Sequence, residues 1–169
     1  MKKLVYLISP NKIDSKFYTT LDRVLAFKNV KFFQLRLKNT KVNSILKIAN
    51  KIKKITKKHK VNFIINDNYI LALKVNADGC HLGQLDGPIM IARKKLKNKI
   101  LGVTCHGSKS LAKNAINNKA DYIAFGSFFK SRLKPKTKKA NLKILKWAKK
   151  EFTKPIVVIG GINNFNYRK

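Results

Sequence analysis

Three polar residues alternate with apolar ones in one short segment of the chain, and they are Gln34, Arg36 and Lys38. Because successive side chains of a strand point to opposite faces, the three share one face and the residues between them form an apolar one. The apolar face has to pack against helices, which turns the polar face inward at the carboxyl end of the strand. Two buried cations are costly unless an anion meets them. The segment therefore predicts a site for an anionic ligand, with a solvated strand edge as the alternative.

Acidic side chains are scarce, with only seven in the chain, yet Asp67, Asp78 and Asp86 lie close together in the sequence. Asp67 and Asp86 each come at or after the end of an expected strand, so adjacent parallel strands would bring both carboxylates to one edge. Two carboxylates suit Mg²⁺, which takes one or two protein oxygens together with waters and substrate phosphates. The alternative is that each caps a following helix. Asp78 is expected to serve the turn before its strand.

The histidines and cysteines form adjacent pairs, Cys80 with His81 and Cys105 with His106. Neighbours on a strand point to opposite faces, so each pair offers only one ligand and zinc is not expected. Thr104 and His106 share strand parity and are expected to face the site. His106 is then a candidate proton carrier, with a structural histidine as the alternative. No glycine-rich nucleotide-binding motif is present, which leaves ATP and dinucleotides unsupported.

The elements that position these residues follow a regular alternation. Short apolar, β-branched or aromatic runs are separated by segments with apolar residues at helical spacing. Near-continuous hydrophobic strands between amphipathic helices indicate a parallel sheet covered by helices, and the succession favours a TIM (β/α)8-type barrel over a flavodoxin-like sheet. The seven expected strands are 4–9, 30–38, 61–67, 79–83, 100–104, 122–126 and 156–160.

The length of 169 residues, 44% of them hydrophobic, suits a single domain over residues 1–169. A complete barrel of this kind usually takes about 200 residues or more. The sequence ends just after its seventh expected strand, so we expect the eighth β/α unit to be missing and the domain to be truncated at its C-terminus.

The formal charge of +32 would attract nucleic acid without sequence preference. The lysines are spread over nearly every segment, which is typical of solvated helix faces, and an anionic small molecule fits the sign equally well. No run approaches the roughly 18 apolar residues of a membrane span, and two cysteines make no disulfide framework. We expect a cytoplasmic protein with small-molecule substrates, no specific nucleic acid and no membrane, and its oligomeric state is left open.

Seven motifs in order resemble the thiamine phosphate synthase family and its close relative, the thiazole tautomerase family, over essentially the whole chain. The motifs are 6–9 (YLIS), 34–38 (QLRLK), 65–67 (IND), 77–86 (ADGCHLGQLD), 102–106 (GVTCH), 120–126 (ADYIAFG) and 159–162 (IGGI).

The resemblance implies an enzyme that joins hydroxymethylpyrimidine diphosphate to a thiazole phosphate, giving thiamine phosphate and diphosphate. Asp67 and Asp86 would hold Mg²⁺ on the diphosphate. Arg36 and Lys38 would be catalytic, because they stabilise the charge on the leaving diphosphate while the thiazole nitrogen attacks the pyrimidine methyl cation. The residues that would hold the pyrimidine diphosphate are Gln34, Arg36, Lys38, Asn66, Thr104 and Lys134.

The thiazole half of the site departs from the family pattern. Where the family carries Thr-x-Thr-Lys, this chain has Ser131 and Lys134 with Leu133 in place of a hydroxyl. Ser131 and Gly161 would hold the thiazole phosphate. The tautomerase relative also has a histidine at the position of His106, whereas the diphosphate-binding cations and carboxylates favour the synthase. The tautomerase and, less favoured, a basic nucleic-acid-binding domain remain as alternatives.

Overall fold

The computed structural model describes residues 4–129 and 140–167 and contains seven strands and six helices in strict alternation there. The strands are β1 Val5–Ile8, β2 Val30–Leu35, β3 Asn62–Asn66, β4 Gly79–Leu82, β5 Ile100–His106, β6 Tyr122–Phe125 and β7 Ile156–Val158. The helices are α1 Ser15–Leu25, α2 Val42–Lys58, α3 Tyr69–Lys74, α4 Ile89–Leu96, α5 Lys109–Asn117 and α6 Lys143–Glu151. The alternation expected from the sequence is confirmed, and the described residues hold no strand after β7.

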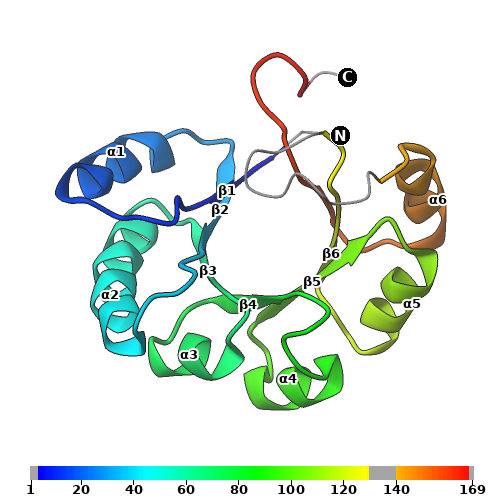
Figure 1. Cartoon of the computed structure of the whole chain (residues 1–169), viewed down its shortest axis with the longest axis horizontal. Helices are drawn as coiled ribbons and strands as arrows, with labels where there is room; N and C mark the ends of the chain where they lie inside the picture. Colours follow the sequence, from blue (N-terminus) through cyan, green and yellow to red (C-terminus); the bar gives the residue numbers. More distant parts are fainter. Residues whose placement is uncertain (1–3, 130–139, 168–169) are drawn as a thin grey trace. The chain divides into compact units, whose positions relative to one another are not determined.

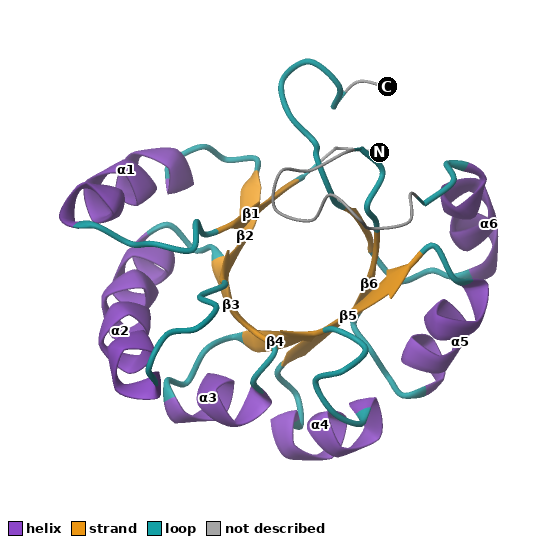
Figure 2. Ribbon diagram, viewed as in Figure 1, coloured by secondary structure: helices purple, strands orange, loops and turns teal. Residues whose placement is uncertain are grey.

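The chain divides into two compact units, the first made of Met1–His81 with Lys95–Ile100 and the second of Leu82–Lys94 with Leu101–Lys169. In the first unit β1, β2, β3 and β4 pair in chain order, and in the second β5, β6 and β7 do so, all parallel. Figure 1 follows the chain through these elements. Within the first unit α1, α2 and α3 lie on one face of the strands, and within the second α5 and α6 do the same (Figure 2).

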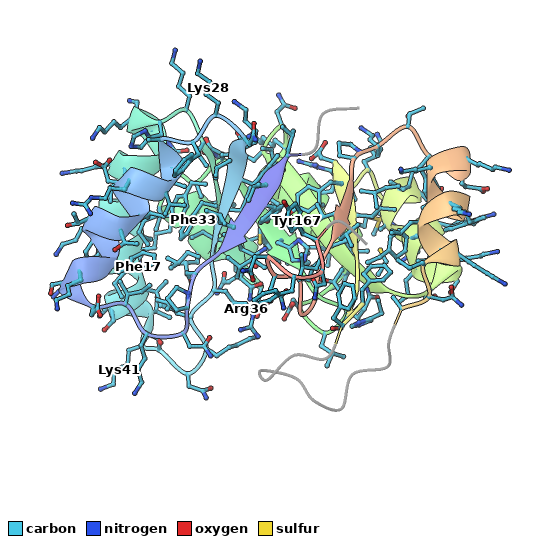
Figure 3. The ribbon with its side chains drawn as sticks, turned by 90° about the horizontal axis from the view of Figure 1, so that it is seen from above. Phe17, Lys28, Phe33, Arg36, Lys41 and Tyr167 are labelled. Atoms are coloured by element: carbon cyan, nitrogen blue, oxygen red, sulfur yellow. The ribbon has the colours of Figure 1, made fainter. Side chains whose placement is uncertain are left out.

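The core of the first unit forms because β2 and β3 turn large apolar side chains toward the helices. Phe33 is 2% exposed, and its ring centroid lies 6.2 Å from that of Phe17 on α1. Both rings are labelled in Figure 3. Ile52 of α2 is fully buried. Since Phe33 faces α1, the neighbouring Gln34 faces away from the helices, as the alternation in the sequence predicts.

Two aspartates, Asp78 and Asp121, tie the start of one strand to the turn before another, and we call them the strand-edge aspartates. Asp78 accepts the N–H of Phe63 on Oδ2 at 2.7 Å and donates its own N–H to the Phe63 carbonyl at 2.9 Å. Asp121 makes the same two contacts with Leu101. Its Oδ2 accepts the Leu101 N–H, and its own N–H donates to the Leu101 carbonyl, each at 2.8 Å. Asp78 lies directly before β4 as expected, but its carboxylate contacts β3 rather than the turn.

All seven acidic residues lie in the described part of the chain, and each is engaged by a hydrogen bond or an ion pair. Asp14 caps α1, and the others contact backbone N–H groups or basic side chains. These others are Asp22, Asp67, Asp78, Asp86, Asp121 and Glu151. The few carboxylates of this +32 chain therefore all make contacts within the fold.

Among the described helices none combines the length and apolar character needed to cross a membrane.

Candidate active site

Strand β2 ends at Leu35, three residues earlier than the sequence suggested, because the N–H of the next residue does not join the backbone ladder with β1. Ser9, the residue after β1, donates its N–H to the Gln34 carbonyl at 2.9 Å, and in a parallel ladder the next bond would run from the Arg36 N–H to the Ser9 carbonyl. The N–H of Arg36 is accepted instead by the Ser9 hydroxyl at 2.9 Å. Arg36 and Lys38 thus lie just beyond the strand rather than within it.

Gln34 is the buried member of the polar face, with 3% of its surface exposed. Its amide Nε2 donates to the Tyr6 hydroxyl at 2.9 Å, and the Tyr6 ring stacks on Phe32 with centroids 5.3 Å apart. A buried amide normally finds such a partner, since leaving it unsatisfied costs free energy. Tyr6 therefore fixes the buried amide of Gln34, two residues before Arg36.

Lys38 and Asp67 form an ion pair between Nζ and Oδ2, with 49% and 27% of their side chains exposed. Asp67 follows the last residue of β3 and has a φ of 65°, a left-handed conformation that aspartate tolerates better than most residues. Its N–H donates to the His81 carbonyl at 2.7 Å. The sequence predicted both residues for the site, and the structure brings them into contact.

The Arg36 guanidinium donates through Nη1 to Asn11 Oδ1 at 3.4 Å. None of the ion pairs formed by the described residues involves Arg36. In Figure 3 Arg36 lies toward the same edge of the first unit as Lys41, and Lys28 lies at the opposite edge. The carboxyl end of β2 therefore carries a cation that no described carboxylate neutralises, which is the condition for binding an anion.

His81 of β4 stands opposite Asn66 in the strand register and is 6% exposed. Burial lowers the pKa of His81 to about 4, although the nearby Asp67 carboxylate acts in the opposite direction. The imidazole is therefore neutral near pH 7 and offers hydrogen bonds rather than charge. Sequence analysis considered His81 only as a zinc ligand and missed this place beside Asn66, which its position in a buried strand could have suggested.

In the second unit Asp86 closes the turn after β4, where Oδ2 accepts the N–H of Gly83 at 2.6 Å. The neighbouring Gln84 donates its amide to the Thr104 carbonyl of β5. Asp86 and Thr104 are both half-buried. Gln84 had no role in the sequence analysis, and its contact with Thr104 has no local signal in the sequence.

The expectation that His106 shares a face with Thr104 is wrong, because the pairing register of β5 shifts between the two residues. His106 is exposed and has a φ of 51°.

Gly161, expected at the thiazole phosphate, has a φ of 68°, and its carbonyl accepts from Asn166 Nδ2 at 2.9 Å. Ser131, Leu133 and Lys134 lie outside the described residues.

Asp67 and Asp86 each carry a carboxylate, which is a hard oxygen donor of the kind that Mg²⁺ takes in proteins. Asp67 belongs to the first unit and Asp86 to the second, and each supplies a hard carboxylate. Within the described ranges no group of three or more His, Cys, Asp or Glu side chains could form a protein cage for a metal.

Comparison with solved structures places the fold among parallel α/β barrels of the TIM type. The structure of 3-dehydroquinate dehydratase from Geobacillus kaustophilus matches 94% of this chain and 74% of its own with a TM-score of 0.69 at 14% identity, which shows the fold alone. Thiamine phosphate pyrophosphorylase from Pyrococcus furiosus matches 98% of this chain and 79% of its own with a TM-score of 0.86 at 28% identity. The barrel class expected from the sequence is confirmed, with seven β/α units or part-units in the described residues.

The model of the thiamine monophosphate synthase family matches residues 5–169, and the chain belongs to this family. A thiamine-phosphate synthase of Pelagibacter ubique is 58% identical over 99% of this chain and 82% of its own length. Another of Erythrobacter litoralis is 40% identical over 96% of this chain and 78% of its own length. The protein is a transferase of thiamine biosynthesis, which confirms the synthase among the functions that the sequence left open.

Proposed function

We propose that the enzyme forms thiamine phosphate by departure of diphosphate from hydroxymethylpyrimidine diphosphate, followed by attack of the nitrogen of the thiazole phosphate, and that Mg²⁺ would assist the departure. The observation that carries this mechanism is the arrangement at the carboxyl ends of β2 and β3. Arg36 has no described carboxylate partner there, and Lys38 lies against Asp67. A cation and a cation–carboxylate pair together match a diphosphate that carries a metal ion.

Arg36 and Lys38 bind the leaving group in this mechanism. The guanidinium presents several N–H donors in a fixed plane, which suits the oxygens of a phosphate group. Lys38 adds a compact charge beside Asp67. Both stabilise the negative charge that grows on the diphosphate as its bond to the pyrimidine methylene breaks. Mg²⁺, held by Asp67 and Asp86, would supply further positive charge to the same oxygens.

Hydrogen-bonding side chains orient the pyrimidine. Gln34 is fixed by Tyr6, and Asn66 stands opposite the neutral His81. The side chains that hold the ring and its diphosphate are Gln34, Asn66, Thr104 and Lys134. Rigid placement is what this reaction needs, since bringing two reactants together removes a large part of the barrier. Ser131 and Gly161 hold the thiazole phosphate.

The reaction needs no proton transfer from the protein. A carbon–oxygen bond to the leaving diphosphate breaks, a carbon–nitrogen bond to the thiazole forms, and the thiazole nitrogen carries no proton that must be removed. The electron pair of the broken bond leaves with the diphosphate. This agrees with a buried His81 that stays neutral and with a Cys105 thiol whose pKa burial raises to about 12.

The direct test is to incubate the purified chain with both substrates, with and without Mg²⁺, and to measure thiamine phosphate by chromatography. We expect product only when the metal is present. Asp67→Asn and Asp86→Asn should each lower kcat at least about tenfold while the unfolding temperature changes little. Asp14→Asn makes the same chemical change at an exposed helix cap and should leave kcat unchanged. Full activity in EDTA, or in both site variants, would remove Mg²⁺ from the proposal.

A second test asks whether the cation and the carboxylate act on one leaving group. Arg36→Ala should lower kcat on its own. Combined with Asp67→Asn, its effect should be smaller than the product of the two separate effects, because residues that share a partner are not additive. Independent, multiplying losses would mean that the two side chains serve different steps.

We also propose that the enzyme works in the cytoplasm. Cys80 and Cys105 are both free thiols buried in the fold, which supports a reducing compartment. Labelling of the native protein in intact cells, followed by fractionation, tests this location.

A further inference from the structure

We propose that Ser9 is a positioning residue, whose hydroxyl fixes the backbone of Arg36 at the end of β2 and thereby places the guanidinium on the leaving diphosphate. The inference rests on the proposed role of Arg36. Ser9 itself does not touch the substrate in this proposal.

The need for such a residue follows from the way the strand ladder stops. In a parallel ladder the bond after Ser9 N–H to the Gln34 carbonyl joins Arg36 N–H to the Ser9 carbonyl, and here the Arg36 N–H does not take that backbone partner. Without a substitute, the backbone of Arg36 would lose its partner at the position where the chain leaves the sheet. A loop that begins with unsatisfied polar groups is free to shift.

The Ser9 hydroxyl supplies the substitute on both sides of Arg36. Oγ accepts the Arg36 N–H at 2.9 Å and donates to the Arg36 carbonyl at 3.4 Å. Ser9 is 7% exposed, so solvent has little access to replace it. One buried hydroxyl therefore contacts both the N–H and the carbonyl of Arg36.

The other end of Arg36 is held from the same short segment. Asn11 Oδ1 accepts from guanidinium Nη1 at 3.4 Å, two residues after Ser9. Ser9 and Asn11 flank Pro10, whose ring fixes its backbone φ. The segment from Ser9 to Asn11 thus contacts Arg36 at its backbone and at its guanidinium. The contact from the Arg36 N–H to Ser9 Oγ is shorter and more buried than the contact from Nη1 to Asn11.

The experiment compares Ser9→Ala with Ser9→Thr, which keeps the hydroxyl, and with Thr20→Ala, which removes an exposed hydroxyl from α1. We expect Ser9→Ala to lower kcat about tenfold, since misplacing a catalytic group by about 1 Å can cost up to about 100-fold. The KM for the thiazole phosphate should change less than twofold. Ser9→Thr should keep most of the activity, and Thr20→Ala should match the unaltered enzyme.

The decisive measurement repeats Ser9→Ala in the Arg36→Ala background. There we expect no further loss of kcat, although the unfolding temperature should fall by the same amount in both backgrounds. Asn11→Ala, on the exposed surface, should show a smaller loss that also disappears in that background.

Two results would overturn the role of Ser9. An equal loss of kcat in both backgrounds would mean that the hydroxyl acts on the fold and not through Arg36. An unchanged kcat in Ser9→Ala would mean that it positions nothing. If Arg36→Ala alone kept full activity, the failure would instead lie in the proposed function, and the role of Ser9 would fall with it.

Discussion

Removing either strand-edge aspartate should destabilise the protein, and Asp121 should matter more than Asp78. Oδ2 of Asp121 accepts from Leu101 N–H at 2.8 Å and from Arg93 Nη1 at 2.9 Å. Leu101 is fully buried, and the Arg93 side chain is only 15% exposed. Asp78 makes a single side-chain contact, with Phe63 N–H, and is itself exposed.

These contacts determine how much free energy of unfolding each variant should lose. Leaving a buried donor without its acceptor costs about 1–3 kcal/mol. Because 43% of the Asp121 side chain is exposed, water compensates in part, and we expect about 2 kcal/mol for Asp121→Ala. For Asp78→Ala the single, more exposed contact gives about 1 kcal/mol. In a chain of this size each kcal/mol shifts the unfolding temperature by about 2–4 °C.

The assay is thermal unfolding followed by circular dichroism, with urea unfolding as a second measure. We expect the unfolding temperature to fall by about 4–8 °C for Asp121→Ala and about 2–4 °C for Asp78→Ala. Asp14→Asn, at a helix cap where asparagine serves as well as aspartate, should change it by less than about 1 °C. Equal losses in the two alanine variants, or none, would refute the argument from shared and buried donors.

Three further outcomes follow from the buried groups. Burial lowers the pKa of His81 from 6.5 to about 4, so between these pH values the unfolded chain binds more protons than the folded one. The free energy of unfolding should therefore fall as the pH drops below about 6.5. The NMR signals of His81 should not titrate above about pH 5.5. Burial raises the pKa of Cys105 to about 12, so it should resist a thiol reagent at pH 8 until urea is added. Phe33→Ala should cost about 3–5 kcal/mol in urea unfolding, because it opens a cavity against Phe17.

Strand and helix positions followed from sequence because the apolar runs are short and regularly spaced. The polar face beginning at Gln34 was also predictable, since alternation fixes faces in any strand. The end of β2 was placed three residues too late because the alternation continues to Lys38, whereas the backbone ladder with β1 stops where the Ser9 hydroxyl takes the Arg36 N–H. A strand boundary set by a partner is a nonlocal event.

The site was predicted in its residue types and less well in its contacts. Asp67 and Lys38 were both selected, but nothing local to either residue indicates that they form an ion pair. The face of His106 was wrong because a shift in pairing with β6 interrupts the alternation that the argument assumed. Ser9 was seen only as part of a motif, since its contact with Arg36 bridges 27 positions of sequence.

The acidic residues give this chain an uneven tolerance to substitution. Its many lysines, such as Lys16 and Lys54, lie on exposed helix surfaces, where exchange for another polar residue changes stability little. Every acidic side chain, by contrast, has a defined partner in a cap, a turn, a strand edge or an ion pair. Exchange among the basic residues can therefore alter the surface without touching the fold, whereas the loss of one carboxylate also removes a contact. In a deep mutational scan we expect Asp78, Asp86 and Asp121, which accept backbone N–H groups, to tolerate fewer substitutions than lysines on exposed helix surfaces such as Lys16 and Lys54.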